Sequence, residues 1–237
     1  MTSQSTLPQI NHSKITGSDV AIMSFAFLIY IPMLGVGVYH YDNADLLRQI
    51  LCQTAAVIGL IIFSLCTILI LRFRKESFIS FGFPKPRLQY FLRGLALMPI
   101  VVIISWLVNV LLYFFYESLN KNVDELQQIV EQALRFPNIL IWVVFFGPII
   151  EEVFFRGFLF SYCKKKLGAK KAIWITSIIF GAIHCDLYRF AALTVIGYIL
   201  ALERERTNTL WAPIVTHIGL NSVMMFLVFV GKSILDK

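Results

Sequence analysis

The chain is short of charged residues: Asp, Glu, Lys and Arg together make up 15% of its 237 residues. A typical soluble domain carries about a quarter. Hydrophobic residues account for 58% of the sequence, and the mean hydropathy is +0.75. These values exclude a large soluble domain and predict an all-α, polytopic bundle of membrane helices.

Cysteine is also scarce, and its spacing is uninformative. The four cysteines form no C-x-x-C pair and fall within or beside apolar runs, at Cys52, Cys66, Cys163 and Cys185. Buried, reduced, structural thiols are typical of such a pattern. The sequence also contains no internal repeat and no low-complexity tract, which excludes repeat architectures.

Acidic residues are outnumbered by basic ones, and the formal net charge is +7. The basic residues gather at the ends of hydrophobic segments, as membrane orientation and contact with anionic lipid require. No basic face occurs in a soluble segment, so nucleic acid is not an expected partner. The expected partners are the lipid bilayer and a substrate within it.

Seven apolar stretches account for most of the chain: residues 20–39, 50–71, 92–116, 138–162, 172–185, 191–202 and 209–230. Five of them reach the length of about twenty residues that a bilayer crossing needs. The stretches 172–185 and 191–202 are shorter, which is typical of buried or re-entrant helices, and the polar turn between them must lie in protein or at an interface. We expect seven membrane helices, or eight with an interfacial one. Residues 122–134 have the helical rhythm of a surface helix, although an ordinary structured loop fits equally well.

Loop charges predict the orientation. Residues 72–93 contain six Lys and Arg against one Glu, and residues 164–171 contain five Lys, whereas the loops 40–49 and 117–135 have an acidic balance. The positive-inside rule therefore places the N-terminus and both basic loops in the cytoplasm. The run after the polar residues 1–19 is too long and too little flanked by basic residues for a cleavable signal peptide.

Ionisable residues lie in the middle of the apolar run 138–162. Glu151, Glu152 and Arg156 would each be costly at that depth, so they are expected to face a protein interior or a watery cavity. Residues four apart share a helix face, so Glu152 can pair with Arg156, while Glu151 is rotated by about 100° and is free to act. The preceding Gly147-Pro148 should loosen the helix beside it. A purely structural ion-pair network is the alternative.

Two histidines and an asparagine lie at a similar depth in other segments. His184 follows Phe180 by one turn, and Asn221 follows His217 by one turn. Neutral His and Asn can donate hydrogen bonds to a developing oxyanion. A single His at this depth could equally bond a neighbouring helix, but together these residues can converge with Glu151 on one site.

A metal is the second way to activate water here. Glu151, His184 and His217 would supply two nitrogens and one carboxylate, a ligand set that zinc enzymes use. No H-E-x-x-H motif is present. A metal-free mechanism needs only Glu151 and one histidine and leaves Asn221 a role with His217 at the oxyanion. We favour no cofactor and keep zinc as the alternative.

The chain contains three short motifs in order, and the sequence T-L-W-A-P at 209–213 precedes the third. The motifs are E-E-x-x-x-R (Glu151, Glu152, Arg156), F-x-x-x-H (Phe180, His184) and H-x-x-x-N (His217, Asn221). Together they resemble the CPBP family of CAAX proteases and bacteriocin-processing enzymes, also called the Abi family. The resemblance covers about residues 140–223. It implies an all-helical intramembrane endopeptidase in which Glu151 activates water, His184 assists, His217 and Asn221 hold the oxyanion, and Glu152 and Arg156 support the site.

The resemblance also leaves questions open. The family name says metalloprotease, whereas a metal-free glutamate mechanism is favoured for its eukaryotic prenyl-protein branch, whose substrate is a prenylated C-terminal tail. Compact bacterial members look tied to peptide maturation or to self-immunity against bacteriocins, which implies a bacterial plasma-membrane protein here. The expected organisation is a cytoplasmic tail (1–19), N-terminal membrane helices and loops (20–137), a CPBP-like catalytic membrane core (138–231) and a C-terminal tail (232–237).

Two other classes of function compete with hydrolysis. One is a non-catalytic immunity or scaffold protein that binds a toxin or receptor and keeps the motifs for folding. The other is a proton-coupled transporter in which Glu151 and the histidines relay protons. No inverted repeat of broken helices is visible in the sequence, which counts against the transporter.

Overall fold

The computed structural model describes residues 14–39, 46–115, 140–187 and 189–235, and within these ranges every regular element is a helix. The all-α expectation is therefore confirmed for the described residues. In chain order the elements are α1 (Gly17–Tyr39), α2 (Leu46–Phe73), α3 (Phe78–Phe81), α4 (Leu88–Phe115), η1 (Ile141–Phe146), α7 (Gly147–Glu152), η2 (Val153–Leu159), α8 (Phe160–Leu167), α9 (Ala169–Ala182), α10 (Phe190–Thr207) and α11 (Trp211–Leu235).

One long helix runs through the middle of the bundle. It is formed by η1, α7, η2 and α8 in unbroken succession, where η1 and η2 are wider, π-helical turns on either side of the Glu151-Glu152 pair. The backbone N–H of Gly147 bonds the carbonyl of Trp142, five residues back. The expectation that Gly147-Pro148 loosens this helix agrees with the widened turn, because proline cannot donate the regular bond and its ring crowds the preceding turn.

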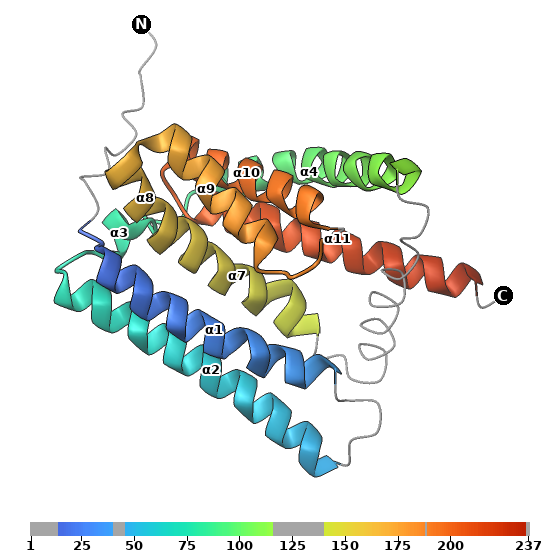
Figure 1. Cartoon of the computed structure of the whole chain (residues 1–237), viewed down its shortest axis with the longest axis horizontal. Helices are drawn as coiled ribbons and strands as arrows, with labels where there is room; N and C mark the ends of the chain where they lie inside the picture. The colour runs from blue at the N-terminus through green and yellow to red at the C-terminus, as the bar shows by residue number, and fades with distance from the viewer. Residues whose placement is uncertain (1–13, 40–45, 116–139, 188, 236–237) are drawn as a thin grey trace, which may run out of the picture.

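The other helices surround this central one (Figure 1). The antiparallel pair α1 and α2 packs on one side, with α1 against η2, while α4, α9, α10 and α11 cover the other side. Aromatic rings fill the first of these contacts: the ring of Phe27 in α1 stacks on Phe154 at 4.5 Å and meets Phe155 edge-on at 5.7 Å. The central helix is thus buried on both sides, and the ionisable residues it carries lie within protein.

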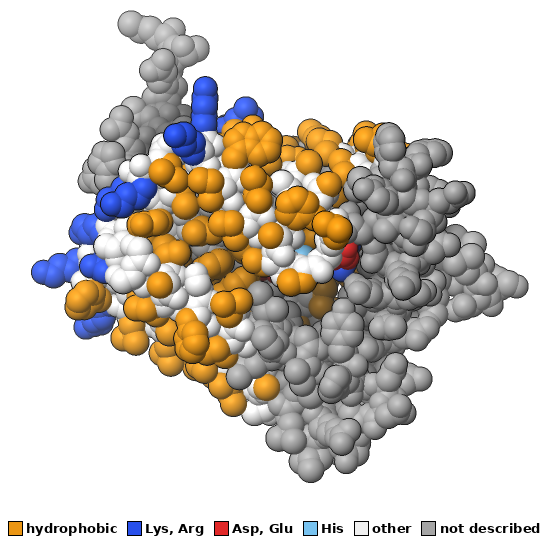
Figure 2. Space-filling model, in the orientation of Figure 1, with side chains coloured by type: hydrophobic (Ala, Val, Ile, Leu, Met, Phe, Trp, Pro, Cys, Tyr) orange, Lys and Arg blue, Asp and Glu red, His pale blue; other side chains and the backbone are white. Residues whose placement is uncertain are grey.

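The outer surface of the bundle is apolar. Large hydrophobic side chains are exposed on α1, α2 and α4, for example Phe25 at 69% and Trp106 at 61%, and Figure 2 shows hydrophobic side chains spread over the face in view. Contiguous apolar surface of this extent is typical of contact with lipid. Among the described residues, Thr54–Phe73 and Leu88–Val108 are long and apolar enough to cross a membrane, and Gly17–Tyr30 and Trp211–Leu227 are shorter apolar helices.

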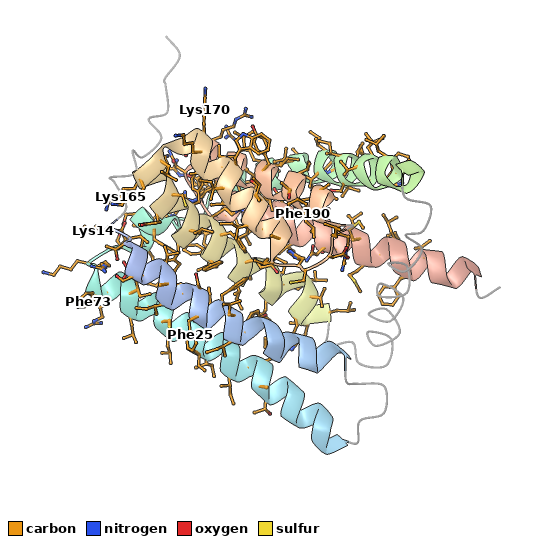
Figure 3. All side chains as sticks on the ribbon, viewed as in Figure 1. Lys14, Phe25, Phe73, Lys165, Lys170 and Phe190 are labelled. Atoms are coloured by element: carbon orange, nitrogen blue, oxygen red, sulfur yellow. The ribbon has the colours of Figure 1, made fainter. Side chains whose placement is uncertain are left out.

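Basic residues mark one end of the bundle. Lys14, Lys165 and Lys170 lie together at the end where α1 begins and α8 meets α9 (Figure 3). At the same end Arg74 of α2 binds Asp19 of α1 in a two-pronged pair, with Nε 2.8 Å from Oδ2 and Nη2 3.0 Å from Oδ1. The loops that the sequence assigned to the same side of the membrane therefore do lie at one end of the molecule.

The structure differs from two expectations and does not describe the segment of a third. The apolar stretch 191–202 is only part of α10, which continues to Thr207 because Glu203 and Arg204 are buried and paired across the bundle. Cys163 is buried as expected, but Cys185 is exposed, so the prediction of a buried thiol was wrong there, since the helix α9 has already ended. The predicted surface segment 122–134 lies outside the described residues.

Candidate active site

The ion pair predicted between Glu152 and Arg156 forms. Nη1 of Arg156 donates to Oε1 of Glu152 at 2.8 Å, and both side chains are almost fully buried. Nη2 of Arg156 donates to the carbonyl of Gly197 in α10 at 3.0 Å, and the guanidinium lies 4.8 Å from the ring centre of Phe180 in α9. Arg156 therefore neutralises the buried carboxylate and ties the central helix to two of its neighbours.

Glu152 has a second partner that sequence reasoning missed. Its Oε1 also lies 2.9 Å from Nδ1 of His217 in α11. A carboxylate accepts hydrogen bonds, so Nδ1 of His217 carries the proton, and in the neutral ring Nε2 keeps the lone pair. Nε2 is the ring nitrogen that faces Glu151, at 3.8 Å from its Oε2. Glu152 thus orients His217 toward the neighbouring carboxylate.

Glu151 differs from Glu152 in partner and in exposure. Within the described part of the chain it forms no hydrogen bond, and its side chain is 23% exposed where that of Glu152 is fully buried. The difference follows from the rotation of about 100° between consecutive residues of a helix. As the spacing of the motif indicated, one carboxylate is held by arginine while the other remains open to water.

His184 and His217 meet at one aromatic ring. The ring of Phe180 lies 5.1 Å from His184 and 5.9 Å from His217 between centroids, edge-on to each. Nδ1 of His184 is 2.8 Å from the carbonyl of Phe180, which can only accept, so Nδ1 is protonated and Nε2 is the free nitrogen in the neutral ring. Phe180 and His184 were predicted to lie one turn apart on the same face, and the hydrogen bond between them fixes the imidazole.

Asn221 bonds the central helix. Its Nδ2 donates to the carbonyl of Val143 at 3.0 Å, within the π-helical turn η1 that precedes Glu151. An amide nitrogen carries two protons, so one N–H remains for another acceptor. The site residues predicted from three separate segments are therefore linked to one another through the Val143 carbonyl, Glu152 and the Phe180 ring.

The spacing of the possible ligands bears on the zinc alternative. Among the residues that the structure describes, no group of three or more His, Cys, Asp or Glu is close enough to hold a metal ion. Both histidines nevertheless present Nε2 with its lone pair, which is the form that ligates zinc.

A second buried polar network, which was not predicted from the sequence, lies next to the site. Thr216, next to His217, donates to Oε2 of Glu203 at 2.8 Å, and Arg204 donates from Nη2 to the carbonyl of Phe81 at 3.0 Å.

Tyr30 of α1 is buried and lies within electrostatic reach of Glu151, with no hydrogen-bond partner for its hydroxyl among the described residues. The E-R-E-R run at 203–206 resembles an ordinary solvated helix end, and a lone Tyr in an apolar helix has no distinguishing pattern.

Comparisons with known proteins find similarity over the part of the chain that carries this site. Residues 133–223 match the model of the type II CAAX prenyl endopeptidase Rce1-like family. A Bacillus subtilis (strain 168) protein, YdiL, whose name describes a membrane peptidase, is 25% identical over 209 residues, covering 87% of this chain and 84% of the relative. The membrane-embedded CAAX protease MroQ of Staphylococcus aureus (strain USA300) is 21% identical over 239 residues, covering 95% of this chain and 94% of the relative. No solved structure matches significantly.

The protein is therefore a membrane endopeptidase, a hydrolase. More particularly, the chain is a relative of the Rce1-like CAAX endopeptidases, and the resemblance read from its three motifs is confirmed.

Proposed function

We propose that the chain hydrolyses a peptide bond of a membrane-associated protein or peptide with a water molecule that Glu151 activates. The observation that carries the proposal is the contrast between two adjacent carboxylates. Glu152 is buried against Arg156, whereas Glu151 is partly exposed, forms no ion pair with an arginine of the described residues and faces Nε2 of His217 at 3.8 Å. A carboxylate that is not neutralised by a cation is the better general base.

The proposed reaction has two steps. Glu151 removes a proton from water as the water oxygen attacks the carbonyl carbon, and the carbonyl oxygen becomes an oxyanion. The C–N bond then breaks as the oxyanion returns its electron pair, and Glu151 gives the proton to the leaving amine. The new carboxyl group and the new amine account for all atoms of the water.

Asn221 is the proposed oxyanion donor that does not depend on protonation. One of its amide protons is bound to Val143, and the second is available for the substrate oxygen. His217 can share this role only when Nε2 is also protonated, because Nδ1 already donates to Glu152. His184, with Nε2 free in the neutral ring, is proposed to orient the attacking water.

The ligand set Glu151, His184 and His217 remains the alternative with zinc. In that version the three side chains would have to move together to hold the ion, which would supply a bound water of lowered pKa. Chelation distinguishes the versions: dialysis of the purified enzyme against a strong zinc chelator leaves the glutamate mechanism intact and abolishes the zinc-dependent one. Activity lost to the chelator and restored by zinc would establish the metal mechanism.

The membrane arrangement is part of the proposal. We propose seven to eight membrane helices, a cytoplasmic N-terminus, and a catalytic core at residues 138–231 that receives its substrate from the bilayer. The gathering of Lys14, Lys165 and Lys170 at one end of the bundle supports this orientation. The substrate experiment determines whether the cleaved protein carries a prenyl group. It also determines whether the cleavage matures a peptide or gives self-immunity against a bacteriocin.

That experiment is comparative membrane peptidomics of cells carrying the wild type or Glu151→Gln. The variant should lose hydrolysis by about 10²- to 10⁴-fold because the amide cannot accept the water proton, while its amount in the membrane stays the same. Glu205→Gln is the matched control, because this carboxylate pairs with Lys164 at the surface, outside the site. Peptides that accumulate only in Glu151→Gln cells are the substrates.

An unchanged peptide profile together with an unchanged self-immunity phenotype in Glu151→Gln cells would overturn the proposal. That outcome would favour the scaffold, in which the motifs serve folding alone. A loss of proton-coupled uptake without a change in peptides would favour the transporter instead.

A further inference from the structure

A cavity of about 280 Å³ opens between α4 and α10, two helices that pack against each other (Figure 1). None of the proposed catalytic residues lines it, although Glu203 in its lining belongs to the polar network beside His217. Its walls are mostly apolar and include Leu97 and Ile100 from α4 and Leu202 from α10. A cavity that is apolar with a few polar groups at defined places is the usual form of a small-molecule site.

Two arginines from different helices line this cavity. Arg93 of α4 and Arg206 of α10 are both exposed at its surface. Among the residues that the structure describes, neither forms a hydrogen bond or an ion pair with another side chain. The planar guanidinium fork of an arginine matches the oxygens of a phosphate group. The cavity therefore offers an anion two cationic donors and, beside them, an apolar wall.

The depth of the cavity in the bundle agrees with a lipid headgroup. Arg206 follows Glu205, which binds Lys164 at 2.6 Å, so the arginine lies at the basic end of the molecule. From there the outer face of α4 is apolar and exposed, with Leu95 at 52% and Ile103 at 56%. An amphiphile with its phosphate at Arg93 and Arg206 would therefore have its acyl chains along α4.

A buried carboxylate at the cavity supplies the second indication of a ligand. Glu203 lines the cavity and is 6% exposed; its Oε2 accepts a hydrogen bond from Thr216, and its Oε1 has no partner among the described residues. An unpaired buried acceptor is costly unless a donor reaches it.

We propose that this cavity binds one anionic phospholipid whose headgroup carries a hydroxyl, with the phosphodiester on Arg93 and Arg206 and the hydroxyl donating to Glu203. Phosphatidylglycerol has this chemistry: a single negative phosphodiester charge, headgroup hydroxyls and two acyl chains. The site is separate from the hydrolytic one and does not depend on the proposed mechanism.

Native mass spectrometry of the purified full-length protein tests the proposal by titration with phosphatidylglycerol or with phosphatidylcholine of the same acyl chains. Phosphatidylglycerol should form a one-to-one complex about tenfold tighter than phosphatidylcholine. The double variant Arg93→Gln/Arg206→Gln should weaken phosphatidylglycerol binding by about tenfold, as expected for losing charge-assisted bonds to phosphate. The control Arg72→Gln/Arg87→Gln removes the same charge from two exposed arginines outside the cavity and should change binding by less than about twofold.

A second variant tests the same site without removing either arginine. Ala96→Phe fills the cavity while both arginines remain, since Ala96 is exposed and lines the cavity, and it should also abolish the one-to-one complex. Equal binding of the two lipids, equal weakening by the control pair, or full binding to Ala96→Phe would overturn the proposal. Displacement of the lipid by millimolar inorganic phosphate would also overturn it, because the site would then recognise free phosphate alone.

Discussion

Glu152 orients His217: Oε1 of this fully buried carboxylate lies 2.9 Å from Nδ1 of the imidazole, and the same oxygen accepts a hydrogen bond from Arg156. The arrangement fixes which ring nitrogen points at Glu151. One carboxylate thus serves a structural ion pair and the alignment of a site residue at the same time.

The first prediction concerns this carboxylate. Glu152→Gln leaves Arg156 buried without its counter-charge and should destabilise the folded protein by about 3 kcal/mol. It should also lower kcat by about 10²-fold, because the preferred tautomer of His217 is lost. Thermal unfolding in detergent and peptide hydrolysis measure the two effects. A Glu152→Gln enzyme with wild-type Tm and kcat would contradict the assigned role.

The second prediction concerns Asn221. Removing its amide in Asn221→Ala frees the Val143 carbonyl and takes away the proposed oxyanion donor, so kcat should fall by about 10²- to 10³-fold with little change in KM. Ser222→Ala is the control one residue away, since its hydroxyl bonds only its own helix at Ile218. If KM rises and kcat holds, Asn221 positions substrate and has no part in stabilising the transition state.

The third prediction compares two glycines at the contact of α4 with α11. A Cβ on Gly94 would lie 2.8 Å from Val215 and 2.9 Å from the backbone carbonyl of Ala212, so Gly94→Ala must push the helices apart. The three atoms nearest to a Cβ on Gly219 would all belong to the flexible side chain of Met98, the first at 3.0 Å. We expect Gly94→Ala to cost about 1 to 3 kcal/mol and Gly219→Ala to be near neutral, because alanine favours the helix.

Thermal unfolding of the two alanine variants decides this comparison. Similar Tm values for both would show that α4 and α11 do not approach as closely as described.

The fourth prediction concerns the clamp between α1 and α2. Arg74→Lys cannot reproduce the two-pronged bond to Asp19 or the additional bond from Nη2 to Thr16. Because Arg74 is a quarter exposed, the loss should be about 1 kcal/mol of stability. Arg72→Lys, at an exposed residue without such bonds in the described structure, should leave Tm unchanged. Equal shifts for both variants would mean that the clamp is not responsible.

The fifth prediction concerns orientation. In a variant whose four native cysteines are replaced by serine, a cysteine introduced at Lys170 should resist a membrane-impermeant maleimide in intact cells and react after permeabilisation, because the basic end is expected in the cytoplasm. A cysteine at Asp42, in a loop predicted to be external, should react in intact cells. The reverse pattern would invert the proposed topology.

Local spacing made several features predictable from the sequence. The Glu152–Arg156 pair joins residues one turn apart in the central helix, which such spacing brings together regardless of the surroundings. The Phe180–His184 bond also joins residues four apart, but His184 lies in the turn that follows α9. The same regularity separates Glu151 from its neighbour. The expectation of widening near Gly147-Pro148 likewise rests on local chemistry, since proline cannot complete the regular bond.

Contacts between helices were not predictable in the same way. The bond from His217 to Glu152 joins residues 65 apart, and the one from Arg204 to Phe81 joins residues 123 apart. Neither pair shares a helix, so no periodicity relates them. The sequence alone determined a helical membrane protein and its similarity to CAAX endopeptidases, and it supplied the residues that we propose for the site. Only the packing of helices decided that Glu152 serves both Arg156 and His217, because such partners depend on which faces meet in space and at what register.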